Sequence, residues 1–272
     1  MIDSIHIFQA MILGVVQGIT EFLPVSSSGH LILARHYFNM PEVPLLFDVF
    51  LHVATLIVVC FFYRSTIVSM SIALIHFITR KMSDEDKTYL RYFLTIIGAT
   101  LITIVVALIL RKVMPEGENV IFVAIMMLFT ALILLYRPNK EKKLNDDFSQ
   151  LRLRHSIITG LAQGFGTLPG ISRSGITISS ALYSGMKREV AGEFAFVLSI
   201  PAILGALVLA SFDYASTPVT ISLMPLLFGS LVAAITGFFS LKMLLWMIGK
   251  ARLWIFSIYL LLLSITILIT SL

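Results

Sequence analysis

QGITEFLPVSSSGH, residues 17–30, places a carboxylate, three hydroxyls and an imidazole in an otherwise apolar sequence. Pro24 and Gly29 interrupt a regular helix there, because proline removes a backbone donor and glycine is conformationally free. Polar groups next to hydrocarbon cost free energy, so a cluster of this kind is by default a candidate functional site. A related stretch, QGFGTLPGISRSGI at residues 163–176, begins 146 residues later.

The composition is that of a membrane protein. Of 272 residues, 58% are hydrophobic and 13% are charged, with a mean hydropathy of +0.95, whereas soluble domains carry about 25% charged residues. The net charge of +5 does not indicate nucleic-acid binding, because the basic residues stand between apolar spans, as topology signals do. The single cysteine, Cys60, excludes an intrachain disulfide. No cleavable signal peptide is expected, since the first Lys or Arg is Arg35.

The hydropathy pattern predicts an all-α integral membrane protein with six transmembrane helices and two re-entrant helical hairpins, at 1–40 and 155–186. Kinks are expected at Pro201 and Pro225. The apolar stretch 66–79 is too short to cross a bilayer, so it is expected to lie at the interface or to extend a helix. The six spans are expected near 45–63, 90–110, 119–136, 190–211, 219–241 and 252–271.

The basic residues predict the orientation. Of the 20 Lys and Arg residues, 16 lie in four segments: 64–91, 137–154, 187–188 and 242–252. The positive-inside rule places these segments in the cytoplasm and both termini outside, which requires both interrupted segments to be hairpins. The chain is then a single membrane domain, 1–272, with repeat one at about 1–136, a cytoplasmic loop at 137–154 and repeat two at about 155–272.

Residues 14–30 and 160–176 align without gaps, GVVQGITEFLPVSSSGH over GLAQGFGTLPGISRSGI, and six of 17 positions coincide. Each hairpin precedes three spans. Because three is odd, the second hairpin enters from the opposite side, which makes this an inverted-topology repeat. The two hairpin tips are then expected to meet near the middle of the membrane and to build one site from both halves.

Each aligned segment contains two glycines four residues apart, Gly14 and Gly18 in the first, Gly160 and Gly164 in the second. Such pairs let helices approach closely, here between the two arms of a hairpin. They are also frequent in membrane helices generally, so a packing role is only one interpretation.

Arg173, in PGISRSGIT at 169–177, needs an anionic partner, because a guanidinium stays ionised in apolar surroundings. One interpretation is a structural ion pair with Glu21, Asp48 or Glu193. The other is a fork for phosphate oxygens, since bidentate geometry suits Arg. The candidate substrate-binding residues offer hydroxyls or backbone N–H groups: Ser26, Ser28, Gly170, Ser172, Ser174 and Thr177.

Glu21 is expected on the same helix face as Gln17, four residues earlier. A carboxylate beside phosphates indicates a hard divalent cation, Mg²⁺ or Ca²⁺, with Glu21, Gln17 and Asp48 as candidate ligands. The alternatives are a salt bridge from Glu21 to Arg173 and a helix-capping role for Asp48.

Ser27 and His30 are the candidate nucleophile and the candidate acid or base. On one helical turn, His30 could reach the hydroxyl of Ser27 or Ser26, and a serine needs a neighbouring base to attack. In the alternative, the hydroxyls only satisfy backbone groups at the hairpin tip. The other histidines have no such neighbours in the sequence and are assigned no chemistry: His6, His36, His52, His76 and His155.

The motifs EFLPVSSSGH at 21–30 and PGISRSGIT at 169–177 resemble those of the undecaprenyl-diphosphatase, or bacitracin-resistance, family, over essentially the whole chain. The resemblance implies inverted repeats with re-entrant hairpins in the bacterial plasma membrane, and an active site open to the outer face. It also implies removal of one phosphate from undecaprenyl diphosphate, which recycles the lipid carrier of cell-wall synthesis. The family's motif residues fall here on Glu21, Ser27, His30 and Arg173.

Gln17 departs from those family members that have a second glutamate at this position. An amide can coordinate through its carbonyl oxygen but adds no charge, so cation affinity or the preferred ion is expected to differ.

Two classes of function stay open. The first is a phosphatase acting on a prenyl diphosphate lipid, in which Ser27 attacks with help from His30, or His30 activates a water. The second is a secondary transporter or lipid-carrier flippase, because inverted repeats with broken helices are a transporter architecture. Transport does not require the Ser, His, Glu and Arg set, which favours the phosphatase. A non-catalytic scaffold leaves the interior charges unexplained. The oligomeric state is open, a homodimer included.

Overall fold

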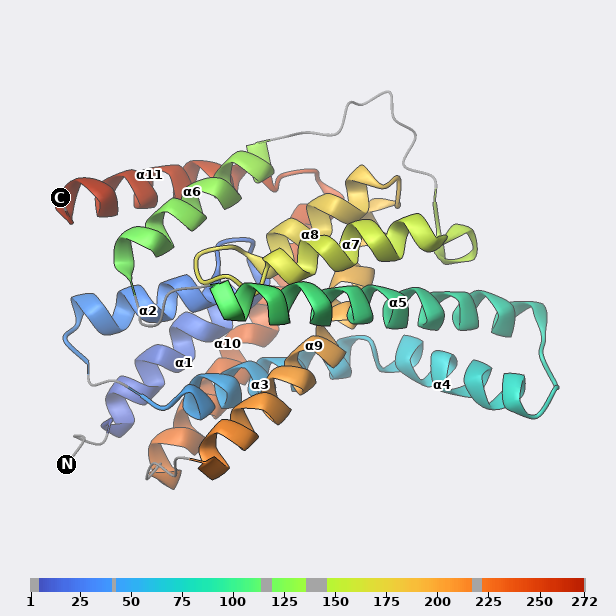
Figure 1. Cartoon of the computed structure of the whole chain (residues 1–272), viewed down its shortest axis with the longest axis horizontal. Coiled ribbons are helices and arrows are strands. Elements are labelled where there is room, and N and C mark those ends of the chain that lie inside the picture. Colours follow the sequence, from blue (N-terminus) through green and yellow to red (C-terminus); the bar gives the residue numbers. More distant parts are fainter. Residues whose placement is uncertain (1–4, 41–42, 114–118, 136–145, 217–221, 272) are drawn as a thin grey trace.

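The computed structural model describes residues 5–40, 43–113, 119–135, 146–216 and 222–271. Within these residues the chain forms α-helices, one short 3-10 helix and a single isolated bridge (Figure 1). In chain order the helices are α1 (Ile7–Phe22), α2 (Ser27–Tyr37), α3 (Leu45–Phe62), α4 (Arg64–Ile78), α5 (Asp84–Val113), α6 (Val120–Leu135), η1 (Phe148–Gln150), α7 (Leu153–Phe165), α8 (Arg173–Tyr183), α9 (Arg188–Ser216), α10 (Leu223–Gly249) and α11 (Trp254–Thr270).

Each interrupted segment consists of two helices joined by a short break, α1 and α2 in the first half, α7 and α8 in the second. The bounds of α2 and α8 lie 146 residues apart at both ends, and α1 and α7 also begin 146 residues apart. Asn39 and Gly185, again separated by this offset, follow α2 and α8 in the left-handed region, with φ of 47° and 107°. The offset found in the sequence is therefore repeated in the local structure.

The long-range packing follows the same offset. α1 packs along α10 and α7 along α5, while α3 packs against α9 and α6 against α11. Figure 1 shows α5 and α7 side by side across the middle of the molecule, and α6 with α11 above them. If every helix is replaced by its counterpart in the other half, the α1–α10 pair becomes the α7–α5 pair. The α3–α9 and α6–α11 pairs stay the same. Two repeats around a pseudo-twofold axis have this pattern.

The spaced glycines do allow close helix packing, but their partner differs from the expected one. A Cβ on Gly14 would stand 2.3 Å from the carbonyl oxygen of Gly229 in α10, and a Cβ on Gly160 would stand 2.6 Å from that of Ala99 in α5. The second glycine of each pair faces the same helix as the first. The glycines thus seat each hairpin on a long helix of the other half, rather than joining the two arms of one hairpin.

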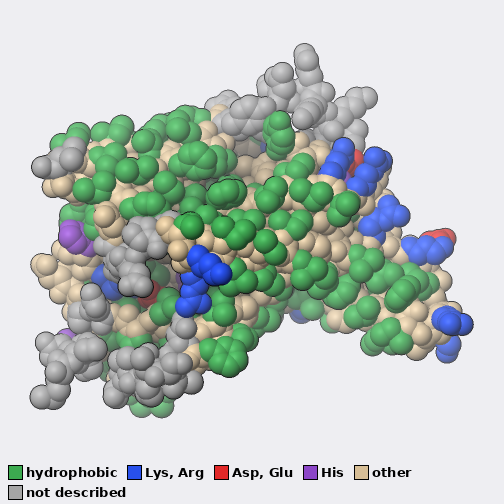
Figure 2. Space-filling model, in the orientation of Figure 1, with side chains coloured by type: hydrophobic (Ala, Val, Ile, Leu, Met, Phe, Trp, Pro, Cys, Tyr) green, Lys and Arg blue, Asp and Glu red, His purple; other side chains and the backbone are tan. Residues whose placement is uncertain are grey.

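The exterior is apolar. Ile57, Phe239 and Leu262 lie within helices, yet they are 65%, 66% and 65% exposed. Figure 2 shows apolar side chains over most of the visible face, while most of the visible Lys and Arg gather at one end, where α4 ends and α5 and α7 begin (compare Figure 1). Among the described residues, four helices are long and apolar enough to cross a membrane: α3, α5, α9 and α10. An exterior of this kind belongs in lipid, so the chain is a multi-pass membrane protein.

Some boundaries differ from those expected. α4 continues α3 after a one-residue break, which corresponds to the helix extension predicted for 66–79. α10 runs to Gly249, so Lys242 lies inside a helix and not in a loop. Pro225 lies in the first turn of α10, where proline costs no intrahelical hydrogen bond, so the kink expected there is wrong. Pro201 does lie inside α9. Half of the loop predicted at 137–154 lies outside the described residues, and the other half contains η1 and the start of α7.

Candidate active site

The breaks of the two hairpins touch each other. The hydroxyl of Ser174 donates to the carbonyl of Leu23 at 3.3 Å. Gly175 lies against Pro24 so closely that a Cβ on the glycine would stand 3.1 Å from the Cβ of the proline. Since α2 and α8 both begin at this junction, the positive ends of two helix dipoles lie there. The tips that the sequence predicted to meet are thus in contact.

The first serine of each motif caps a helix. The Oγ atom of Ser26 accepts from the backbone N–H of Gly29 at 3.3 Å, and that of Ser172 accepts from Gly175 at 3.1 Å. The serine two residues after each cap, Ser28 or Ser174, lies against it, at 3.5 Å in the first half and 3.2 Å in the second. Ser26 has φ 72°, a strained value for a residue other than glycine. These hydroxyls stabilise the helix starts that face the junction.

Gly170 turns the second break. Its φ of +93° is one that L side chains rarely adopt, and a Cβ there would stand 2.4 Å from the carbonyl oxygen of Val123 in α6. Its own carbonyl accepts from the hydroxyl of Thr130 at 3.3 Å, and the same hydroxyl accepts from the N–H of Ser172 at 3.1 Å. α6 therefore holds the second hairpin tip in place.

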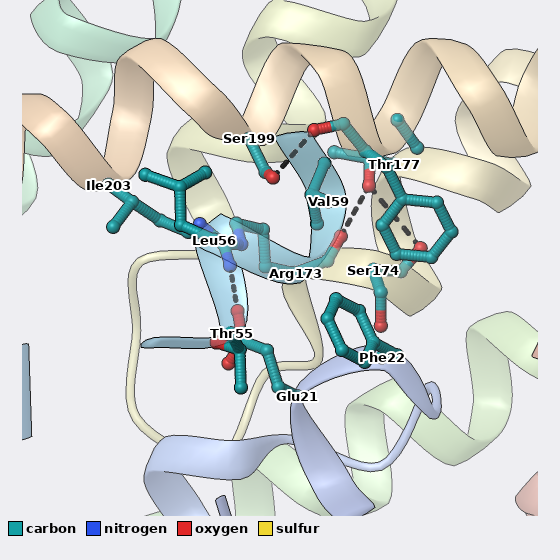
Figure 3. A pocket seen from close by; sticks show the side chains of 12 residues that line it. Glu21, Phe22, Thr55, Leu56, Val59, Arg173, Ser174, Thr177, Ser199 and Ile203 are labelled. Atoms are coloured by element: carbon teal, nitrogen blue, oxygen red, sulfur yellow. Dashed lines mark hydrogen bonds and ion pairs between the residues drawn. The ribbon is translucent and has the colours of Figure 1, made fainter. Parts of the chain in front are cut away.

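Glu21, at the end of α1, gathers polar side chains from three other helices, although it is only 7% exposed. Its Oε1 atom forms an ion pair with Arg173 of α8. Its Oε2 atom accepts from the hydroxyl of Ser27 at 2.7 Å and lies 2.9 Å from both Gln17 Nε2 and His52 Nδ1. Figure 3 shows the guanidinium of Arg173 pointing at this carboxylate. An ion pair between Glu21 and Arg173 thus joins the two halves of the chain at this point.

Of the three acids considered as partners for Arg173, the ion pair is with Glu21. Both carboxylate oxygens of Asp48 lie 2.9 Å from one guanidinium nitrogen of Arg35. Glu193 accepts a hydrogen bond from a threonine of α4 at 2.6 Å. Asp48, a candidate metal ligand from the sequence, is therefore held in an ion pair of its own.

His30 does not contact a serine hydroxyl as expected. Its Nδ1 atom lies 2.7 Å from the backbone carbonyl of Ser26, and its Nε2 atom lies 2.7 Å from the hydroxyl of Tyr259 in α11. Because a carbonyl only accepts, Nδ1 carries the proton and Nε2 accepts from the tyrosine. The hydroxyl of Ser27 donates its hydrogen bond to Glu21 instead.

A cavity of about 10 Å³ lies beside the ion pair, which is room for about one water molecule. The closed ion pair therefore leaves no room in this cavity for a group larger than water. Thr55 of α3 and Ser199 of α9 were not predicted, because single hydroxyls inside apolar runs are common in membrane helices. The polar lining, drawn in Figure 3, comes from four helices: Glu21, Thr55, Arg173, Ser174, Thr177 and Ser199.

Comparison with known protein families gives a match over most of the chain. The family model described as Bacitracin resistance protein BacA matches residues 10–266, which include both hairpins. The chain belongs to the BacA bacitracin-resistance family. The family resemblance predicted from the two motifs is thereby confirmed.

Three curated relatives of this BacA-family chain are named undecaprenyl-diphosphatase. The protein of Treponema denticola is 43% identical over 93% of both chains. That of Borreliella burgdorferi is 39% identical over 96% of this chain and 97% of its own. That of Methanobrevibacter smithii is 40% identical over 93% of both chains. The similarity therefore extends over whole proteins of the same length and not over the motifs alone.

His52 is a further residue of this BacA-family site that the sequence did not predict. Its two polar neighbours, Gln17 and Glu21, lie on another helix, and Gln17 is 35 residues away along the chain. The only local signal is Asp48, four residues before His52, because this spacing puts two polar side chains on one face of an apolar helix.

Proposed function

We propose that the chain is an integral-membrane phosphatase that hydrolyses undecaprenyl diphosphate to undecaprenyl phosphate and phosphate. This reaction recycles the lipid carrier of peptidoglycan synthesis and underlies bacitracin resistance. The observation that carries the proposal is the Glu21–Arg173 ion pair at the junction of the two tips, with Ser27 bonded to the same carboxylate. The names of the relatives support the substrate.

In the proposed reaction, the guanidinium of Arg173 leaves Glu21 and binds the terminal phosphate of the lipid, where its fork matches two phosphate oxygens. The two helix N-termini at the junction add partial positive charge. These groups would neutralise the charge that develops on the transferring phosphoryl group. The candidate substrate-binding hydroxyls nearest to Arg173 are those of Ser174 and Thr177, which line the cavity.

Ser27 is the proposed nucleophile. Its hydroxyl donates to Glu21 at 2.7 Å, within reach for proton transfer to a general base. Its oxygen attacks the terminal phosphorus, its proton passes to the carboxylate oxygen that Arg173 has left, and the phosphoanhydride bond breaks to release undecaprenyl phosphate. Water then hydrolyses the phosphoserine. His30 is the candidate acid or base of this second step, and Nε2, the nitrogen that faces Tyr259, is the atom that would carry the proton.

A divalent cation, Mg²⁺ or Ca²⁺, is part of the proposal, with Glu21 and Gln17 as ligands. Within the described residues no three His, Cys, Asp or Glu side chains gather, so the ligand set would include an amide. Gln17 fits this role, because its buried Oε1 atom has no hydrogen-bond partner and hard cations prefer oxygen ligands. When bound, the cation would neutralise charge on the phosphates.

The proposed topology is six spans and two re-entrant hairpins in an inverted repeat, with the site open to the outer face of the plasma membrane. α1 packs on α10 as α7 packs on α5, and this correspondence supports the repeat. The distribution of Lys and Arg supports the orientation. The prenyl tail of the substrate would lie between helices, in the lipid layer.

Phosphate release from undecaprenyl diphosphate by the purified protein in detergent tests the proposal. Detergent micelles have no two sides, so release of phosphate requires hydrolysis. We expect one phosphate per lipid, with loss of release after chelation and recovery with Mg²⁺ or Ca²⁺. Absence of release, together with lipid movement across liposomes that contain the protein, would favour a flippase instead.

A further inference from the structure

His52 has no part in the reaction proposed above, although it touches two of its residues. Its Nδ1 atom lies 2.8 Å from the side-chain nitrogen of Gln17 and 2.9 Å from Oε2 of Glu21. Gln17 is fully buried, and its nitrogen also lies 2.9 Å from the same Oε2 atom. The three side chains therefore form a closed triangle of polar atoms at the end of α1.

Hydrogen bonds alone do not satisfy this triangle. If Nδ1 of His52 carries a proton and donates to Glu21, it cannot accept from Gln17. If it accepts from Gln17, its lone pair and the carboxylate face each other without a proton between them. In either case the buried Oε1 atom of Gln17 has no partner. An uncompensated acceptor in apolar surroundings is costly, and a water or a cation satisfies it. Oε1 of Gln163 is unpartnered as well, so the feature specific to the first half is the contact between the imidazole and the carboxylate.

A cation among the three side chains supplies a positive charge between the carboxylate and the imidazole. Rotation of the Gln17 amide by half a turn exchanges its nitrogen and oxygen, which brings Oε1 towards His52 and Glu21 and places the nitrogen where Oε1 has no partner. The lone pairs of a carboxylate oxygen, an amide oxygen and an imidazole nitrogen then converge. Adjacent ligands of an octahedral ion with bonds of about 2.1 Å lie about 3.0 Å apart, close to the observed separations of 2.8 and 2.9 Å.

We propose that Nδ1 of His52 is a ligand of the divalent cation, together with Glu21 and Gln17. This inference rests on the proposed function, and it assigns the cation site an imidazole in place of a second carboxylate. Imidazole suits transition metals, whereas oxygen ligands alone suit Mg²⁺ and Ca²⁺. The site therefore binds Mn²⁺, which accepts both kinds of ligand, more tightly than it binds Mg²⁺ or Ca²⁺.

The second half of the chain provides an internal comparison. Gln163, the counterpart of Gln17, donates to the backbone carbonyl of Leu198, which is the counterpart of His52 at the same offset of 146 residues. The counterpart of Glu21 is Thr167. The amide thus reaches the same position on the following helix in both halves, but only the first half supplies a carboxylate and an imidazole. The cation site belongs to that half alone.

Electron paramagnetic resonance of Mn²⁺ bound to the purified full chain tests the assignment. Electron spin-echo modulation detects a directly bound ¹⁴N nucleus, so the wild type should show imidazole nitrogen. His52→Gln should lose this signal and bind Mn²⁺ about 10- to 100-fold more weakly. His36→Gln is the matched control, because His36 is exposed and lies outside the site. It should keep both the signal and the affinity.

Two outcomes overturn the inference. One is wild-type protein that binds Mn²⁺ without nitrogen modulation, and the other is modulation that persists in a folded His52→Gln. If that variant does not fold, ¹⁵N-histidine incorporated into the wild type decides, because a bound imidazole then changes the modulation from ¹⁴N to ¹⁵N. Cation-dependent phosphate release with no bound nitrogen would leave the proposed function intact and reject only the role of His52.

Discussion

Glu21 and Arg173 neutralise each other in surroundings where either charge alone would be costly. Removing one partner from a buried pair costs about 3–5 kcal/mol, so in the substrate-free protein the pair stabilises the contact between the two halves. A lipid diphosphate can replace the carboxylate as the partner of the guanidinium, because it offers two charged oxygens to the same fork. In the proposed mechanism, Arg173 would thus both hold the tips together and bind the substrate.

At the scale of single residues, the sequence predicted Glu21, Ser27 and Arg173. Each stands in a motif whose polar side chains are costly in apolar surroundings and therefore indicate a functional site. It could not choose among three acids as the partner of Arg173. That choice depends on which helices meet, and only the structure shows that Asp48 is taken by Arg35. The ring contacts of His30 were equally out of reach, since they involve the backbone of its own helix start and a side chain of α11.

Ser27→Ala should lower the turnover number by about 1,000-fold or more, since it removes the attacking oxygen. Rapid-quench experiments on the wild type should trap a phosphoserine at this position. Ser71→Ala is the control, because that hydroxyl only bonds to the carbonyl of its own helix. Near-normal turnover of Ser27→Ala, with no trapped phosphoserine, would instead support attack by a water that His30 activates.

At the scale of helices, the hairpins are short pieces seated on long helices of the opposite half. α1 lies on α10 and α7 lies on α5, with glycine backbone at each contact. The spacing of the glycines predicted close packing, but periodicity says nothing about which helix is the partner. The 146-residue offset, by contrast, could be recognised in the sequence and returns in the bounds of α2 and α8.

Gly14→Ala should destabilise the protein by about 1–3 kcal/mol, because the added methyl group meets backbone that cannot move aside. The contact is the carbonyl of Gly229, 2.3 Å from the new Cβ. Gly205→Ala is the matched control, since a Cβ there meets nothing within 4 Å, and alanine favours a helix by about 1 kcal/mol. Thermal unfolding in detergent measures both. Equal melting temperatures for the two variants would contradict the packing described for α1 and α10.

At the scale of the whole molecule, the two halves differ in chemistry although they share an architecture. The first half supplies the acid, the hydroxyl and the imidazoles, and the second supplies the guanidinium. Composition and charge distribution predicted a multi-pass helical membrane protein. The path of the chain through the bilayer is less accessible from the sequence, because α4, α6 and α11 have 15, 16 and 17 residues, near the lower limit for a span.

An inverted repeat predicts that the two hairpins open to opposite sides of the membrane. In a Cys60→Ser background, which removes the single cysteine, Phe38→Cys lies just after the first hairpin and Lys187→Cys just after the second. An impermeant maleimide added to intact cells should label the first and not the second. The reverse preference is expected in inverted vesicles. Labelling of both positions from one side would rule out the inverted arrangement.

The most direct test of the account compares two arginines that both pair with an acid, the partly buried Arg173 with Glu21 and the buried Arg35 with Asp48. Replacing each by lysine keeps the charge but removes the planar fork. Phosphate release from undecaprenyl diphosphate should fall by about 100-fold or more in Arg173→Lys, because the fork binds the transferring phosphate, and should stay within a few-fold of wild type in Arg35→Lys. Equal, near-normal rates in the two variants would contradict the role of Arg173 and show that its ion pair is structural only.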